Sequence, residues 1–129
     1  MKPVSRRKCP ALAGRTVFQL TEKDGIRLAK LRVAGGEAEP IPLNLGNLRL
    51  YGQLTPNAVA PDGRILFAVD SPDSWFESAG TIDPRTGRVE KVPTTFNGDI
   101  HSPGWTKDRR IVAARFPMKS SLWRFRPGK

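Results

Sequence analysis

Two stretches of the sequence, 46 residues apart, follow the same pattern, and this repeat constrains the fold more than any other feature. They are NAVAPDGRILFA (57–68) and PGWTKDRRIVAA (103–114). In each, an aspartate begins a turn, and arginine, isoleucine and an apolar run follow, which predicts a strand. The carboxylate of Asp62 suits such a turn because it can accept a backbone N–H two residues on, and Gly63 takes a positive φ without strain. Arg109 replaces that glycine in the second stretch, so we expect a turn of another type there.

A second pattern also recurs along the chain. LRVAGGEAEPIP (31–42) and GTIDPRTGRVEKVP (80–93) each predict a strand, a turn and a strand that ends in an apolar residue and proline. SLWRFRPGK (121–129) begins like the same unit. A repeat of about 45 residues built from strands and turns is typical of a β-propeller blade.

Individual strands follow from local patterns. TVFQL (16–20) predicts a short strand, and RILFAVD (64–70) predicts a strand covered on both faces because five apolar residues follow one another. IRLAKLRV (26–33) favours a strand, with a short helix ending at Gly35–Gly36 as the alternative. Pro40 and Pro42 confine the next segment to a sheet edge, and residues 43–54 are expected to form a connector.

These segments resemble the TolB-like and WD-repeat-like bacterial β-propellers over roughly residues 26–129. Those proteins show the pattern P-x-W-S-P-D-G-x-x-I-x-F, followed by L-W-x-x-D-x-x-T-G. The matching positions are Pro61, Asp62, Gly63 and Ile65; Pro103, Trp105, Asp108 and Ile111; Asp83, Thr86 and Gly87; and Leu122 and Trp123. The chain departs from the pattern at Val59, Lys107 and Arg109.

The predicted fold is all-β, with about two and a half four-stranded antiparallel propeller blades. We expect a basic irregular arm over 1–14 and blades over 15–48, 49–97 and 98–129. Closed propellers have about 4–8 blades, so this segment is expected to close only with further chain or by oligomerisation. The expected blade-turn residues are Asp62, Gly63 and Asp108, and the expected inter-blade core consists of Ile65, Phe67, Ile82, Trp105, Ile111, Trp123 and Phe125.

The net charge of +10 is divided unevenly. Residues 1–32 and 101–129 are each strongly basic, whereas residues 33–100 carry nine acidic and five basic side chains. The basic ends are either solvated surface or contacts to an anionic partner. The candidate contacts are Lys2, Arg6, Arg7, Lys8, Lys107, Arg109 and Arg110. The aromatic residues among the C-terminal basic residues are expected in the core, with a single-strand nucleic-acid platform as the alternative.

No motif indicates catalysis, a cofactor or a metal. His101 and Cys9 are each the only residue of their type and lie far apart in the sequence, so a nucleophilic pair is not expected. The Ser-x-x-Lys spacing in SRRK (5–8) lacks its companion motifs, and DSPDS (70–74) is expected to be a solvated loop. The chain contains no apolar run of membrane-spanning length, and the short apolar stretch after the basic N-terminus does not match a secretory signal, which favours a cytoplasmic location.

The resemblance implies a non-catalytic propeller segment that acts as a scaffold for a protein or ligand, with self-association through open blade edges. Two alternatives remain. One is binding of nucleic acid or another anionic polymer through the basic ends. The other is the propeller part of a larger enzyme, such as a peptidase of the prolyl oligopeptidase type.

Overall fold

The computed structural model describes residues 7–12, 15–32, 34–95 and 97–128, and these form strands, turns and extended segments without helix. The first sheet contains β1 (Arg7–Leu12), β2 (Arg15–Glu22), β3 (Gly25–Arg32) and β4 (Glu39–Pro40). The second contains β5 (Arg49–Tyr51), β6 (Ile65–Asp70), β7 (Ser78–Ile82) and β8 (Val89–Lys91). The third contains β9 (Gly98–Trp105) and β10 (Ile111–Pro117). The predicted all-β class is therefore confirmed.

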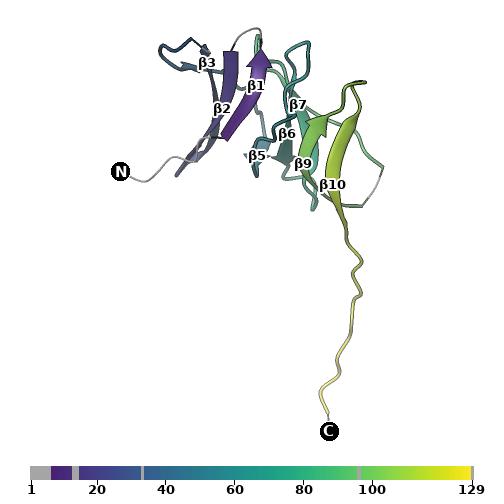
Figure 1. The fold of residues 1–129 in the computed structure, drawn as a ribbon. Coiled ribbons are helices and arrows are strands. Elements are labelled where there is room, and N and C mark those ends of the chain that lie inside the picture. Colours follow the sequence, from purple (N-terminus) through teal and green to yellow (C-terminus); the bar gives the residue numbers. More distant parts are fainter. Residues whose placement is uncertain (1–6, 13–14, 33, 96, 129) are drawn as a thin grey trace.

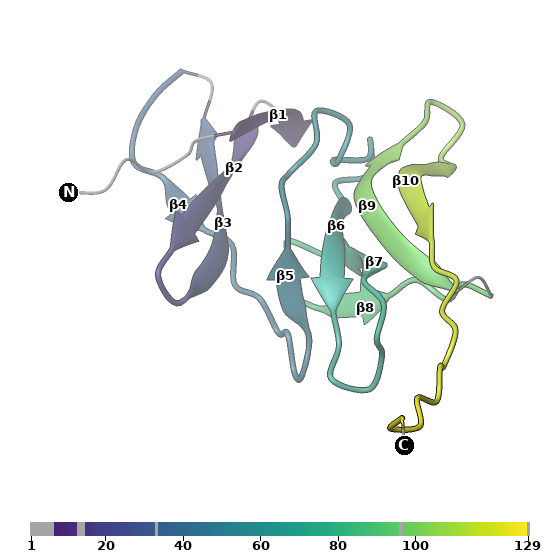
Figure 2. The same cartoon turned by 90° about the horizontal axis from the view of Figure 1, so that it is seen from below.

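Strands that are neighbours in the sequence pair antiparallel within every sheet. The second sheet lies between the first sheet and the β9–β10 hairpin (Figures 1 and 2). Chain order is thus preserved in space, because short turns can join only adjacent antiparallel strands. None of the three sheets closes on itself.

Several strand predictions are confirmed. β2, β3 and β6 occupy the predicted segments, and β3 replaces the alternative of a helix. The first five residues of β6 are buried, as expected for a strand covered on both faces. Pro40 lies in β4, which pairs only with β3 at the edge of its sheet, where a missing N–H leaves no ladder partner unsatisfied.

Three predictions are wrong. β1 occupies part of the expected irregular arm and pairs with β2, so the first sheet begins at Arg7 and not at residue 15. Part of the expected connector forms the strand β5, because the backbone of these three residues pairs with the end of β6. Residues 118–128 form no strand, although SLWRFRPGK was expected to begin one.

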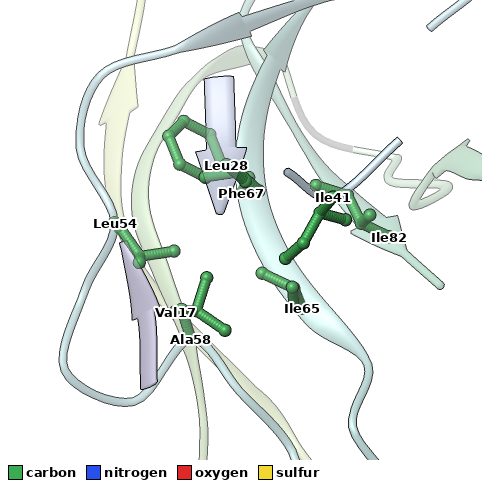
Figure 3. Close-up of a cluster of buried hydrophobic side chains, with 8 residues drawn as sticks. All are labelled: Val17, Leu28, Ile41, Leu54, Ala58, Ile65, Phe67 and Ile82. Carbon is green, nitrogen blue, oxygen red and sulfur yellow. The ribbon is translucent and has the colours of Figure 1, made fainter. Parts of the chain in front are cut away.

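The main hydrophobic core lies between the first and second sheets (Figure 3). Val17 and Leu28 from the first sheet meet side chains of β6 and β7 and of the segments before and after β5. Ile65, Phe67 and Ile82, which the sequence placed in the core, have exposed fractions of 0%, 1% and 0%. Burying side chains of this size removes most of their apolar surface from water, and each contributes about 1.5–3 kcal/mol.

The repeat predicted from the sequence is also present in the geometry of its two turns. In the first, Ala60 N–H donates to Arg64 C=O (2.8 Å), and Gly63 N–H donates to Ala60 C=O (2.9 Å). In the second, Thr106 N–H donates to Arg110 C=O (2.8 Å), and Arg109 N–H donates to Thr106 C=O (3.1 Å). The two hydrogen-bond patterns are equivalent.

Arg109 therefore takes the place of Gly63 in the same kind of turn. Its φ is +62°, and that of Gly63 is +90°, so the expectation of a different turn type is wrong. Asp62 behaves as predicted, because its Oδ1 accepts a hydrogen bond from Arg64 N–H at 3.1 Å. That backbone hydrogen bond holds the pKa of the Asp62 carboxyl below its ordinary value.

A buried glutamine joins the first sheet to the segment between β5 and β6 of the second sheet. The Gln19 side chain donates to Gly52 C=O (2.9 Å) and accepts from Leu54 N–H (2.7 Å). Gln19 is only 4% exposed, so water cannot easily replace these bonds. The Gln19 side-chain amide therefore supplies hydrogen-bond partners to two backbone groups, as a neighbouring strand would.

Replacing Gln19 with alanine should lower the free energy of unfolding by about 1–3 kcal/mol, because it leaves the buried Leu54 N–H without its partner. Chemical denaturation of the full chain measures this loss. Gln53→Ala is the matched control, because Gln53 is exposed in the same segment and its replacement should change stability by less than about 0.5 kcal/mol. Equal effects of the two substitutions would contradict the bridging role of Gln19.

Candidate interaction surface

Exposed apolar side chains gather at the C-terminal end of the chain. Nine large hydrophobic residues are exposed among the described residues, and seven of them lie between Ile111 and Phe125. They are Ile111, Val112, Phe116, Met118, Leu122, Trp123 and Phe125, and we call them the C-terminal apolar surface. These side chains are close in the sequence and provide exposed apolar groups that a binding partner can cover.

The fold explains this exposure. β9 contacts both β6 and β7 of the second sheet, whereas β10 pairs with β9 at the outer edge of the third sheet. After β10 the chain extends away from the sheets (Figure 1). Trp123 is 77% exposed and Phe125 is 87% exposed, so nothing among the described residues covers this segment.

The predicted core positions Ile111, Trp123 and Phe125 are thus wrong. Ile111 is 38% exposed, and the other two side chains lie in the segment beyond β10. The sequence pattern identified them as residues that favour burial, but burial requires a neighbouring layer. The second sheet has a layer on each side, and the third has one only on the side of the second sheet (Figure 2).

Trp105, also predicted in the core, is partly buried at the end of β9. The guanidinium carbon of Arg64 lies 5.3 Å from the centre of its ring, in cation–π range. The backbone N–H of Trp105 donates to Asn57 C=O at 2.7 Å. Trp105 therefore fastens the third sheet to the second, in keeping with a structural role.

The predicted basic contacts divide between two parts of the fold. Lys107, Arg109 and Arg110 are exposed at the turn between β9 and β10, and Arg110 Nε lies 3.0 Å from Asp108 Oδ2. Lys2 and Arg6 lie outside the described residues. Arg7 and Lys8 belong to β1 in the first sheet, so the structure does not gather the two groups on one sheet.

Arg109 holds a left-handed backbone conformation that costs a residue with a side chain about 1–2 kcal/mol relative to glycine. Arg109→Gly should therefore raise the free energy of unfolding by about 0.5–1 kcal/mol, the gain being reduced by the greater entropy of glycine in the unfolded chain. Lys107→Gly serves as the control, because Lys107 has no positive φ, and it should not stabilise the chain. Denaturant titration of both variants checks this, and destabilisation by Arg109→Gly would contradict it.

A polar and aromatic cluster is formed by residues of β5, β9 and β10 together with Glu77, which immediately precedes β7. His101 Nε2 lies 3.0 Å from Glu77 Oε2, and the His101 ring makes edge contacts with Tyr51 (5.8 Å) and Phe116 (4.9 Å). Glu77 Oε2 is buried and has no hydrogen-bond donor of good geometry. Sequence reasoning missed Glu77 and Tyr51, since no local motif relates residues 51, 77 and 101.

Burial raises the pKa of Glu77, and the nearby His101 opposes part of this rise. A carboxyl with a raised pKa favours the folded state when it is protonated, so its contribution to stability declines as the pH rises above about 4.5 through the raised value. We expect the Glu77→Gln variant to lack this loss of stability as the pH rises above about 4.5. Urea denaturation at several pH values measures it, with exposed Glu90→Gln as control. An unchanged slope in the Glu77 variant would contradict the prediction.

The cluster does not assemble the groups of a metal or nucleophile site. Within the described ranges, no three His, Cys, Asp or Glu side chains are placed to hold a metal ion.

The DSPDS loop is stabilised by its own hydrogen bonds, among them Ser74 N–H to Ser71 C=O at 3.2 Å. The loop presents Trp75, which is 96% exposed and which the sequence did not single out. In the part of the chain that the structure describes, no helix is long and apolar enough to span a membrane.

Comparison of the chain with protein-family models, with curated proteins and with solved structures finds no match to any of them. The functional proposal therefore rests on three local features of the structure. They are an exposed apolar surface, a basic turn and a buried polar cluster.

Proposed function

We propose that the chain is a non-catalytic, propeller-type β scaffold that binds protein through the C-terminal apolar surface. The observation that carries this proposal is the gathering of seven of the nine exposed large hydrophobic residues between Ile111 and Phe125. Tryptophan and phenylalanine are favoured at the centres of protein interfaces, because they bury large areas with few rotatable bonds.

The propeller-type architecture is supported by the sheet arrangement. Two four-stranded antiparallel meanders are followed by a hairpin that repeats the turn of the second sheet. Each sheet packs against the next in chain order (Figures 1 and 2). Propeller blades are four-stranded sheets arranged in the same way, so this interpretation agrees with the resemblance noted from the sequence.

Photo-cross-linking in the producing cells tests the protein-binding proposal. We expect p-benzoylphenylalanine in place of Trp123 to give a discrete protein adduct. The same group in place of Trp75 is the control, because Trp75 is even more exposed than Trp123 but lies in another part of the chain, and we expect it to give no such adduct. Absence of any adduct at position 123, or the same adducts at both positions, would count against the proposal.

A second candidate function is binding of an anionic polymer at the β9–β10 turn. Arg109 supports it, because a charged residue keeps a strained backbone conformation where the equivalent turn has glycine, and such strain is often found at functional sites. The binding constant for DNA or RNA should then fall steeply as salt concentration rises, because neutralised phosphates release counterions. Lys107→Ala and Arg109→Gly should weaken binding, and a salt-independent constant would reject this function.

A further inference from the structure

β10 is an edge strand whose outer side pairs with no other described strand. Edge strands are commonly protected from further pairing by being short or by containing proline. The edges of the two four-stranded sheets follow this rule, since β1 contains Pro10, β4 contains Pro40, and β5 and β8 have three residues each. β10 has seven residues and a proline only at its last position, so it lacks both protections.

The backbone of β10 directs hydrogen-bonding groups to this open side. Ile111 pairs with Trp105 of β9, and Trp105 N–H points away from β10, because it donates to Asn57 C=O at 2.7 Å. In an antiparallel ladder, both residues of such a pair direct their N–H and C=O groups away from each other. The groups of Ile111 therefore face the open side, and those of Ala113 do so too, because the direction alternates along a strand.

The second sheet shows which element fits this side, because β6 is the equivalent of β10 in the 46-residue repeat. Val59 bridges to Ile65 on one side of β6, and β7 pairs antiparallel along the other side. Trp105 and Ile111 are the equivalent of the Val59–Ile65 pair, so β9 corresponds to the Val59 side. The open side of β10 then corresponds to the side of β6 that β7 covers. An antiparallel strand is thus the element that fits there.

The charge around this edge indicates that such a strand is acidic. From Arg109 to Lys129 the sequence has seven basic side chains and no acidic one. Lys107 precedes β10 and Lys119 follows it; both are exposed, and neither has an ion-pair partner among the described residues. An added strand with acidic side chains is therefore attracted at both ends of β10, and a basic one is repelled.

We propose that an acidic segment of another protein adds to β10 as an antiparallel strand, on the side that corresponds to β7. Main-chain hydrogen bonds to Ile111 and Ala113 hold the segment, as in other cases of strand addition to a sheet edge. Its apolar side chains cover Val112 and Phe116, which are 60% and 53% exposed. This strand addition rests on the proposed function and identifies the chemistry of the partner and the way it binds.

Fluorescence anisotropy of the full chain with a labelled decapeptide of alternating glutamate and valine tests the strand addition. We expect binding, and we expect N-methylation of the four central amides of the peptide to weaken it at least about tenfold, because the main-chain hydrogen bonds are lost. A decapeptide of alternating lysine and valine should also bind at least about tenfold more weakly. No binding of the glutamate peptide, or equal binding of its N-methylated form, overturns the proposal.

A proline at position 113 tests the edge of the protein itself. Ala113→Pro removes an N–H that faces the open side and leaves the ladder to β9 intact, so the chain should remain folded. We expect it to bind the glutamate peptide at least about tenfold more weakly than the wild type. Circular dichroism and thermal unfolding check the fold of the variant. Wild-type affinity in Ala113→Pro overturns the proposal, and the N-methylated peptide tests the same hydrogen bonds on the unaltered chain.

Charge reversal tests where the acidic side chains lie. The double variant Lys107→Glu/Lys119→Glu should weaken binding of the glutamate peptide at least about tenfold. Lys91→Glu is the control, because Lys91 is exposed on β8, the open edge of the second sheet, and it should change the affinity less than about twofold. Equal effects of the double variant and the control overturn the placement of the acidic strand on β10.

The outcomes separate failure of the strand addition from failure of the proposed function. If position 123 gives a protein cross-link in cells while the glutamate peptide does not bind, the strand addition is overturned and protein binding through the C-terminal apolar surface stands. A peptide that binds the Ala113→Pro variant like the wild type has the same consequence when the cross-link is present. Lack of both the cross-link and peptide binding overturns both.

Discussion

Phe67→Ala is expected to destabilise the chain by about 3–5 kcal/mol, which is a large part of the 5–15 kcal/mol typical of a whole domain. Phe67 is 1% exposed and belongs to the cluster that joins the first two sheets. Its removal leaves a cavity that the surrounding strands cannot fill, because their backbones are fixed by ladder hydrogen bonds. Urea denaturation followed by circular dichroism measures the loss.

Because the alanine variant could be largely unfolded, Phe67→Leu provides a second measurement. It retains most of the apolar volume and should cost about 1–2 kcal/mol. Phe116→Ala is the control, since Phe116 is 53% exposed on β10. A Phe67→Ala variant no less stable than Phe116→Ala would show that the cluster in Figure 3 is not the main core.

Gly87→Ala is expected to cost about 2–5 kcal/mol, because it combines backbone strain with a steric clash. Gly87 has φ of +76°, and an added Cβ would lie 2.5 Å from Pro42 O. The close approach exists because Asn44 N–H donates to Gly87 C=O at 2.7 Å, which joins the segment between β4 and β5 to the turn between β7 and β8. The substitution should loosen that junction.

Gly52→Ala measures the backbone strain without the steric clash. Gly52 has nearly the same φ, +77°, but nothing lies within 4 Å of an added Cβ. It should therefore cost only the backbone term of about 1–2 kcal/mol. Equal losses of unfolding free energy in the two variants would contradict the clash at Gly87.

Much of the local structure follows from sequence patterns. The five-residue apolar run of β6 predicted its burial, and Pro40 predicted an edge strand. The Asp62–Gly63 turn has its predicted hydrogen bond. β1 and β5 were missed because their pairing partners, and not their own composition, make them strands. Of the site, the basic turn was predicted, whereas Glu77 and Tyr51 were not, because only the tertiary structure brings them to His101.

The sequence by itself determined the all-β class, the repeat and the identity of the side chains that favour burial. These depend on the alternation of apolar residues and on turn residues, which act over a few positions. Only the tertiary structure decided which of those side chains are covered. Phe67 lies between two sheets, and Trp123 extends into solvent, because burial depends on the layers that neighbouring sheets provide. It also decided that Arg109 adopts the conformation of Gly63, since the pairing of β9 with β10 sets the turn.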